Sequence, residues 1–158
     1  KESWDAELHP LTAADDIAVK ADRFPGKAVV ITGGEPLIYN LDYLTEQLQR
    51  RGIQTFIETS GAYPLSGKWD WICLSPKKFK APRPDITPFA NELKVIVFNK
   101  SDFAWAEQYA QTVSPDCKLY LQPEWSKSKE ITPLIVDYVM ANPKWEISLQ
   151  THKFLNIP

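Results

Sequence analysis

Six short apolar runs constrain the fold more than any other feature of this sequence. They have strand length, and helical periodicity lies between them at residues 12–24, 41–52, 101–113 and 131–141. Nearly continuous apolar strands favour a parallel sheet covered on both faces over an antiparallel sheet with one face exposed to solvent. We therefore predict an α/β fold whose strands are residues 27–32, 53–60, 69–75, 92–98, 118–122 and 145–150.

Two connections limit how this sheet is built. Residues 60–69 link the second and third predicted strands, and they are too few for the usual helical crossover between parallel strands. We expect no helix there, and therefore fewer helices than strands. A loop is expected at residues 75–91, because its four prolines remove backbone donors and favour extended neighbours. The expected helix N-caps are Thr12, Asn40 and Ser101.

Composition and charge exclude several classes of function. The 158 residues carry a formal net charge of -2, and the densest basic run, residues 76–84, is local, so we expect no nucleic-acid partner. No apolar run is long enough for a membrane span, and the charged first residues do not resemble a secretory signal. We therefore expect a cytoplasmic protein. Cys73 and Cys117 are far apart and the chain has 2 histidines, so we expect no metal ligands in this chain.

Each predicted strand ends in a block of polar residues. Ligands of parallel α/β sheets bind at the carboxyl ends of the strands, so blocks that meet on one rim predict a single site. Any block alone is also typical of an ordinary turn, and only their convergence favours a ligand site. The blocks are residues 32–35, 58–61, 75–77, 99–100, 122–124 and 150–152, the last of which we expect the final strand to deliver to the rim.

The first block, TGGE, follows a buried strand directly. Gly33 and Gly34 lack a Cβ atom, so the backbone there can approach a ligand closely or take a positive φ. Glu35 adds a carboxylate that can accept hydrogen bonds from an ammonium group. Alternation along the next strand points Thr59 away from the face that carries Glu58, so we expect Thr59 to matter less than Glu35 for ligand binding.

These residues resemble the radical S-adenosylmethionine (SAM) superfamily, whose GGE motif binds the amino group of the methionine moiety of SAM. The further stretches ETSG, LSPK, NELKVIV, LQP and QTHKFLNIP resemble one family closely, the 7-carboxy-7-deazaguanine synthases of the queuosine pathway. The resemblance runs over residues 32–158. It implies one radical SAM core domain over residues 1–158, with an incomplete partial barrel of about six mostly parallel strands and fewer helices.

One departure from the family concerns its iron–sulfur cluster. The family holds a 4Fe–4S cluster with three cysteines ahead of the first helix, and the opening KESWDAELHP resembles the residues just after the last of them. The resemblance therefore implies a chain truncated at its N-terminus. Such a chain would lack the cluster loop, the first strand and a magnesium-binding threonine, and it would be inactive alone. Two scattered cysteines cannot replace three clustered thiolates.

The resemblance also implies a role for individual residues. The pterin substrate would be faced by Thr32, Glu58, His152 and the terminal Pro158, with Glu58 as the catalytic residue and close to the SAM ribose as well. The residues implied to bind SAM are Gly33, Gly34, Glu35, Ser75, Pro76, Lys77, Gln122, Pro123, Glu124 and Trp125.

The chemistry implied for an intact family member is a radical ring contraction. The reduced cluster gives one electron to SAM, and the released 5'-deoxyadenosyl radical takes a hydrogen atom from 6-carboxy-5,6,7,8-tetrahydropterin. A Mg²⁺-assisted contraction then expels ammonia and leaves 7-carboxy-7-deazaguanine. The implied partners are the pterin, a reductant such as flavodoxin or ferredoxin, and a second copy in a homodimer. Two alternatives stay open: another radical SAM enzyme, or a binding module that holds an adenosyl ligand without turnover.

Overall fold

The computed structural model describes residues 11–155, which form one six-stranded sheet and five α-helices. All neighbouring strands are parallel, and they lie in chain order from β1 to β6, which confirms the predicted α/β fold. The strands are β1 (Ala28–Ile31), β2 (Gln54–Thr59), β3 (Trp71–Leu74), β4 (Glu92–Val97), β5 (Lys118–Pro123) and β6 (Trp145–Ile147). The helices are α1 (Ala14–Asp22), α2 (Asp42–Gln49), α3 (Ser101–Ala110), α4 (Ser128–Ala141) and α5 (Thr151–Phe154).

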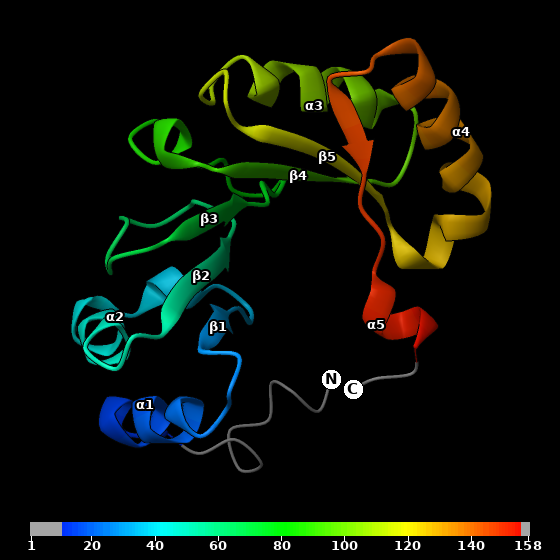
Figure 1. Ribbon diagram of the computed structural model, residues 1–158. Coiled ribbons are helices and arrows are strands. Elements are labelled where there is room, and N and C mark those ends of the chain that lie inside the picture. The colour runs from blue at the N-terminus through cyan, green and yellow to red at the C-terminus, as the bar shows by residue number, and fades with distance from the viewer. Residues whose placement is uncertain (1–10, 156–158) are drawn as a thin grey trace.

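The sheet is an open arc. Figure 1 shows β1 and β6 at its two ends, with α2, α3 and α4 outside the curve. In β2 and β4, residues on one face are buried and residues on the other are half-buried or exposed. The expectation of a sheet covered on both faces was therefore wrong for the described residues. Helices cover the outer face, whereas the inner face stays accessible, as a partial barrel requires.

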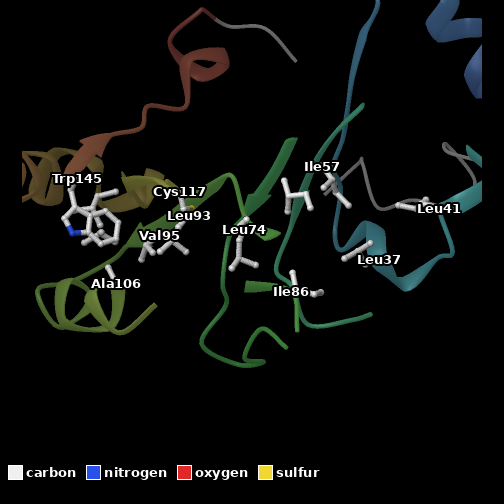
Figure 2. Packing of buried hydrophobic residues seen from close by; sticks show 14 of the residues in the cluster. Leu37, Leu41, Ile57, Leu74, Ile86, Leu93, Val95, Ala106, Cys117 and Trp145 are labelled. Atoms are coloured by element: carbon white, nitrogen blue, oxygen red, sulfur yellow. The ribbon is translucent and has the colours of Figure 1, made fainter. Parts of the chain in front are cut away.

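The hydrophobic core lies between the outer face and these helices (Figure 2). Leu93 and Val95 of β4 are fully buried, and Trp145 at the start of β6 is 1% exposed. The indole of Trp145 donates a 2.8 Å hydrogen bond from Nε1 to Glu107 of α3, so its polar atom is satisfied inside the core. Burial of such a side chain contributes about 1.5–3 kcal/mol, and this packing holds the strand ends in fixed positions.

The connection between β2 and β3 contains no helix, as predicted. Asp70 fixes the end of this connection, because its Oδ2 accepts a hydrogen bond of 2.8 Å from the backbone N–H of Thr55. Residues 75–91 also form the expected loop, with one 3-10 turn at Thr87–Phe89. None of the helices in residues 11–155 combines the length and the apolar character that a membrane span needs.

Most helix and strand ends differ from the prediction by one to three residues, whereas the starts of β4, β5 and β6 and the end of α4 were predicted correctly. The N-cap positions of α1, α2 and α3 are Ala13, Leu41 and Lys100, each one residue from the predicted cap. Helix α4 begins three residues early, at Ser128, because a 3-10 turn capped by Glu124 leads directly into it. The last strand was predicted too long: β6 ends at Ile147 rather than Gln150.

Candidate functional site

The first part of the rim is the turn after β1. Gly33 has φ +145°, which a residue with a side chain rarely adopts. Glu35 lies beside β2 because its carboxylate accepts three hydrogen bonds from that strand end. Oε1 accepts from Thr59 Oγ1 at 2.5 Å, and Oε2 accepts from Ser60 N at 2.8 Å and from the Ser60 hydroxyl. Leu37 N donates to Oε1 at 3.2 Å, so Glu35 also caps the 3-10 turn Pro36–Ile38.

These bonds change the expected role of Thr59. Its side chain does lie on the buried outer face, opposite to that of Glu58, as alternation predicts. It nevertheless contacts Glu35, because the β1 turn folds over the end of β2. A hydrogen bond therefore joins Thr59 to Glu35, and that Thr59 matters less than Glu35 for ligand binding stays a prediction. The ammonium group of a ligand would share this carboxylate with Thr59 and Ser60, or bind the backbone carbonyls of the glycine turn.

The second part of the rim is a charged cluster on the inner face. Lys94 of β4 places Nζ 2.8 Å from Oε2 of Glu58 on β2, and the Lys94 side chain is only 14% exposed. Lys77, just past β3, donates a 3.0 Å hydrogen bond from Nζ to Ser75 Oγ. Burial lowers the pKa of Lys77, although the nearby Glu58 opposes this effect. Burial also lowers the pKa of Lys94, but Cys73, Glu58 and Glu92 raise it by more.

Glu92 completes the inner-face cluster. Its Oε2 accepts a 3.2 Å hydrogen bond from Trp71 Nε1, and its Oε1 lies 3.4 Å from the Cys73 thiol. Glu92 and Glu58 carry two negative charges, and Lys77 and Lys94 carry two positive ones. The cluster is therefore neutral as a whole, and it presents both donors and acceptors to the inside of the arc.

The third part of the rim lies at the ends of β5 and β6. Gln122 is buried and its Oε1 accepts a 3.1 Å hydrogen bond from Ser148. A hollow of about 240 Å³ lies between the end of β5 and α5, and Pro123, Trp125 and Phe154 are among the residues that line it. Phe154 of α5 packs edge-on against the Trp125 ring, with centroids 5.5 Å apart.

The other predicted site residues lie outside the glycine turn and the charged cluster. Glu124 uses Oε2 to cap the next turn, through Ser126 Oγ at 2.5 Å and Lys127 N at 3.2 Å. His152 lies in α5 and is exposed, so a helix and not the final strand carries it. Thr32 lines a separate hollow between α1 and α2. Pro158 lies outside the described residues.

The part of the chain that the structure describes does not fit an iron–sulfur cluster. No three His, Cys, Asp or Glu side chains in residues 11–155 are grouped as metal ligands. Cys73 and Cys117 are both buried, the first on β3 and the second just before β5. Burial raises the pKa of both thiols, that of Cys117 to about 11, so neither is prepared to bind iron as a thiolate.

Sequence reasoning missed two residues of this site, Glu92 and Lys94, and it placed Ser60 on the rim without giving it a role. The available signal was the stretch ELKVIV, where two charges alternate with apolar residues. That pattern places Glu92 and Lys94 on one face of β4 and opposite to the core.

Comparison with known proteins identifies the family, although no family model matches the chain. A 7-carboxy-7-deazaguanine synthase from Flavobacterium psychrophilum is 56% identical over 158 residues, which are 100% of this chain and 75% of that protein. A synthase of the same name from Synechocystis is 45% identical over 99% of this chain and 75% of its own length. The crystal structure of QueE from Escherichia coli matches with a TM-score of 0.77 at 29% identity, over 88% of this chain and 64% of that one.

These similarities extend over the whole sheet and the rim that ends its strands. They confirm the resemblance drawn from the GGE turn and from the later strand ends. The chain belongs to the 7-carboxy-7-deazaguanine synthase family of radical SAM enzymes.

Proposed function

We propose that this chain is one radical SAM core domain. Together with the cluster loop of the family, it would convert 6-carboxy-5,6,7,8-tetrahydropterin to 7-carboxy-7-deazaguanine and ammonia. One observation carries the proposal: Glu35, Glu58, Lys77 and Gln122 all lie at the carboxyl ends of parallel strands on one rim. Ligands of such sheets bind at that edge.

The described residues fit SAM, which carries a carboxylate, an ammonium group and an apolar adenosyl group. In the proposal, Gly33, Gly34 and Glu35 bind the amino group, because both glycines are exposed beside a carboxylate. Ser75, Pro76 and Lys77 bind the carboxylate end and the ribose. The hollow lined by Pro123 and Trp125 accommodates the adenine, with Gln122 and Glu124 beside it in the chain. When bound and reduced, SAM supplies the radical that abstracts a hydrogen atom from the substrate.

Glu58 is the proposed catalytic and substrate-facing residue. Its side chain is 36% exposed on the inner face, and its carboxylate can accept hydrogen bonds from the donor-rich edge of a pterin. It can also hold a proton during the ring contraction. Thr32, His152 and the α-carboxylate of Pro158 stay proposed as further substrate contacts. The chain supplies position and charge, and the cofactors supply the difficult chemistry.

Several finer expectations are part of the same proposal. Mg²⁺ would assist the ring contraction, and a flavodoxin or ferredoxin would supply the electron. We further expect a homodimer in the cytoplasm. The family membership supports the first three of these statements, and the composition of the chain supports the last.

The direct test is anaerobic reconstitution with iron and sulfide. A protein in which the family's cluster loop precedes Lys1 should show cluster absorbance and release 5'-deoxyadenosine from SAM. The 158-residue chain should do neither, because its two cysteines cannot bind the cluster. Cluster formation by the 158-residue chain alone would contradict the proposal. SAM binding without any cleavage by the longer protein would favour the adenosyl-binding module instead.

A second test addresses the C-terminus. A few residues appended after Pro158 should weaken pterin binding by blocking its α-carboxylate, and His152→Ala should have a similar effect. SAM cleavage in the absence of substrate should continue in both variants. Unchanged catalytic efficiency of the appended protein would remove Pro158 from the proposed site.

A further inference from the structure

The structure assigns a function to Lys94, a residue that the proposed site has not yet used. We propose that Lys94 is a positioning residue that holds the carboxylate of Glu58 in its place over the inner face of the sheet. The inference rests on the proposed function, because the role of Glu58 toward the pterin is part of it. It adds a residue two strands away whose effect on the substrate acts through Glu58.

The contact between Lys94 and Glu58 spans an intervening strand of the sheet. Glu58 is on β2 and Lys94 is on β4, so the two side chains meet above the intervening strand β3. The register pairs Glu58 with Cys73 on that strand, and Cys73 with Glu92 on the next. Cys73 on β3 has a small side chain beside Glu58, and Glu58 and Lys94 meet at 2.8 Å across that strand.

Stability alone does not account for a charged residue at this position. Lys94 is 14% exposed, and a lysine loses much of its hydration when it is buried to that degree. Apolar side chains often replace a buried ion pair at no cost to stability. The neighbouring Val95 and Ile96 show that this strand accommodates apolar residues on both faces. The pair is better explained by the fixed carboxylate that it creates.

The other charged side chains of the cluster have hydrogen-bond partners of their own, so Lys94 is the cation that contacts Glu58. Glu92 already receives hydrogen bonds from Trp71 and Cys73, and Lys77 donates to Ser75. Of the ion pairs between described residues, the only one that spans this face joins Lys94 and Glu58. Without Lys94, Glu58 would lose the cation that contacts it, and the nearby Lys77 donates to Ser75 instead.

The test uses the protein that carries the family's cluster loop before Lys1. Lys94→Met should weaken equilibrium binding of the carboxytetrahydropterin about tenfold to a hundredfold, the loss expected for a hydrogen bond to a charged group. Lys94→Arg should recover most of this affinity, because it keeps the cation. The loss of pterin affinity should exceed any loss of SAM affinity, because Glu58 faces the substrate. The control is Lys20→Met on the exposed face of α1, which should bind the pterin normally.

A double-mutant cycle separates positioning from direct contact. In a Glu58→Gln background, Lys94→Met should cost less than about threefold in pterin affinity, since the carboxylate to be positioned is gone. An equal loss in both backgrounds would overturn the proposal, because Lys94 would then contact the substrate itself. Wild-type affinity of Lys94→Met would overturn it as well. Should Lys94→Met fail to fold, Lys94→Gln takes its place in the same cycle.

A measurement on the 158-residue chain tests the pair without substrate or cofactor. In an NMR titration, Lys94 should lose its proton at lower pH in Glu58→Gln than in wild type. An unchanged Lys94 titration would refute the ion pair and with it the inference. If the longer wild-type protein binds no pterin, the proposed function fails, and this titration still decides whether Lys94 holds Glu58.

Discussion

Replacement of Glu35 by alanine should destabilise the fold even in the absence of any ligand. The carboxylate receives four hydrogen bonds, from Leu37 N, the Thr59 hydroxyl, Ser60 N and the Ser60 hydroxyl. A hydrogen bond to a charged group contributes about 1.5–3 kcal/mol, but the four share one acceptor group and do not add. Ser60 is half-buried and can turn to water, whereas Thr59 is 2% exposed and loses its acceptor.

We therefore expect Glu35→Ala to lower the free energy of unfolding by about 2–4 kcal/mol. The assay is urea denaturation of the 158-residue chain, followed by circular dichroism. With a slope of about 2 kcal/mol per molar urea, the midpoint should fall by roughly 1–2 M. Glu35→Gln should lose less, because its amide oxygen still accepts hydrogen bonds.

The matched control is Glu46→Ala on helix α2. Glu46 is partly exposed, and its ion pair among the described residues is with Arg50 at 2.7 Å, four residues along the helix. Such a pair contributes about 0.3–0.5 kcal/mol, so the midpoint should barely move. Equal midpoints for Glu35→Ala and Glu46→Ala would refute the conclusion that Glu35 ties the β1 turn to β2. Thr59→Ala should add little to Glu35→Ala, because the two share a hydrogen bond.

Three further predictions concern buried groups. Asp102→Asn should cost about 1.5–3 kcal/mol in urea denaturation, because Asp102 accepts backbone hydrogen bonds after β4 and pairs with a lysine. Burial raises the pKa of Asp102, but these partners lower it by more. The contribution of Asp102 to the free energy of unfolding is therefore present above about pH 4 and lost as pH falls further. The free energy of unfolding of Asp102→Asn should accordingly depend less on pH below about pH 4 than that of the wild type. Gly61→Ala should cost more than about 1 kcal/mol in the same assay, since φ is +73° and a Cβ would lie 2.6 Å from Leu74 Cδ1. Cys73 and Cys117 should react slowly with a thiol reagent at pH 7.5 and fast in urea, because burial raises the pKa of both; rapid reaction of the native chain would contradict this.

The sequence predicted the sheet because each strand is a local apolar run with a turn at its end. Parallel pairing and the helix-free connection at residues 60–69 followed from run composition and length. The curvature of the sheet was not predicted from the apolar runs. The signal for an open inner face is the alternation of charged and apolar residues within strands such as ELKVIV. The end of β6 was misplaced for a similar reason: Ser148 still donates to Leu121, after which the chain turns into α5.

The site could be predicted only as far as it depends on strand ends. Glu35 and Glu58 follow from their places after β1 and near the end of β2. Their partners do not, because Ser60 and Lys94 reach them through turn geometry and across β3. Contacts of that kind depend on register and curvature, which no short window of sequence contains.

The central claim is that this rim binds SAM and the carboxytetrahydropterin as a 7-carboxy-7-deazaguanine synthase does. The most direct measurement is mass spectrometry of products from the protein that carries the family's cluster loop before Lys1. After anaerobic incubation with reductant, SAM, Mg²⁺ and 6-carboxy-5,6,7,8-tetrahydropterin, we expect 7-carboxy-7-deazaguanine, ammonia and 5'-deoxyadenosine. Glu58→Gln should release 5'-deoxyadenosine but form little deazapurine. Release of 5'-deoxyadenosine by the wild type with no deazapurine at any substrate concentration would contradict the account.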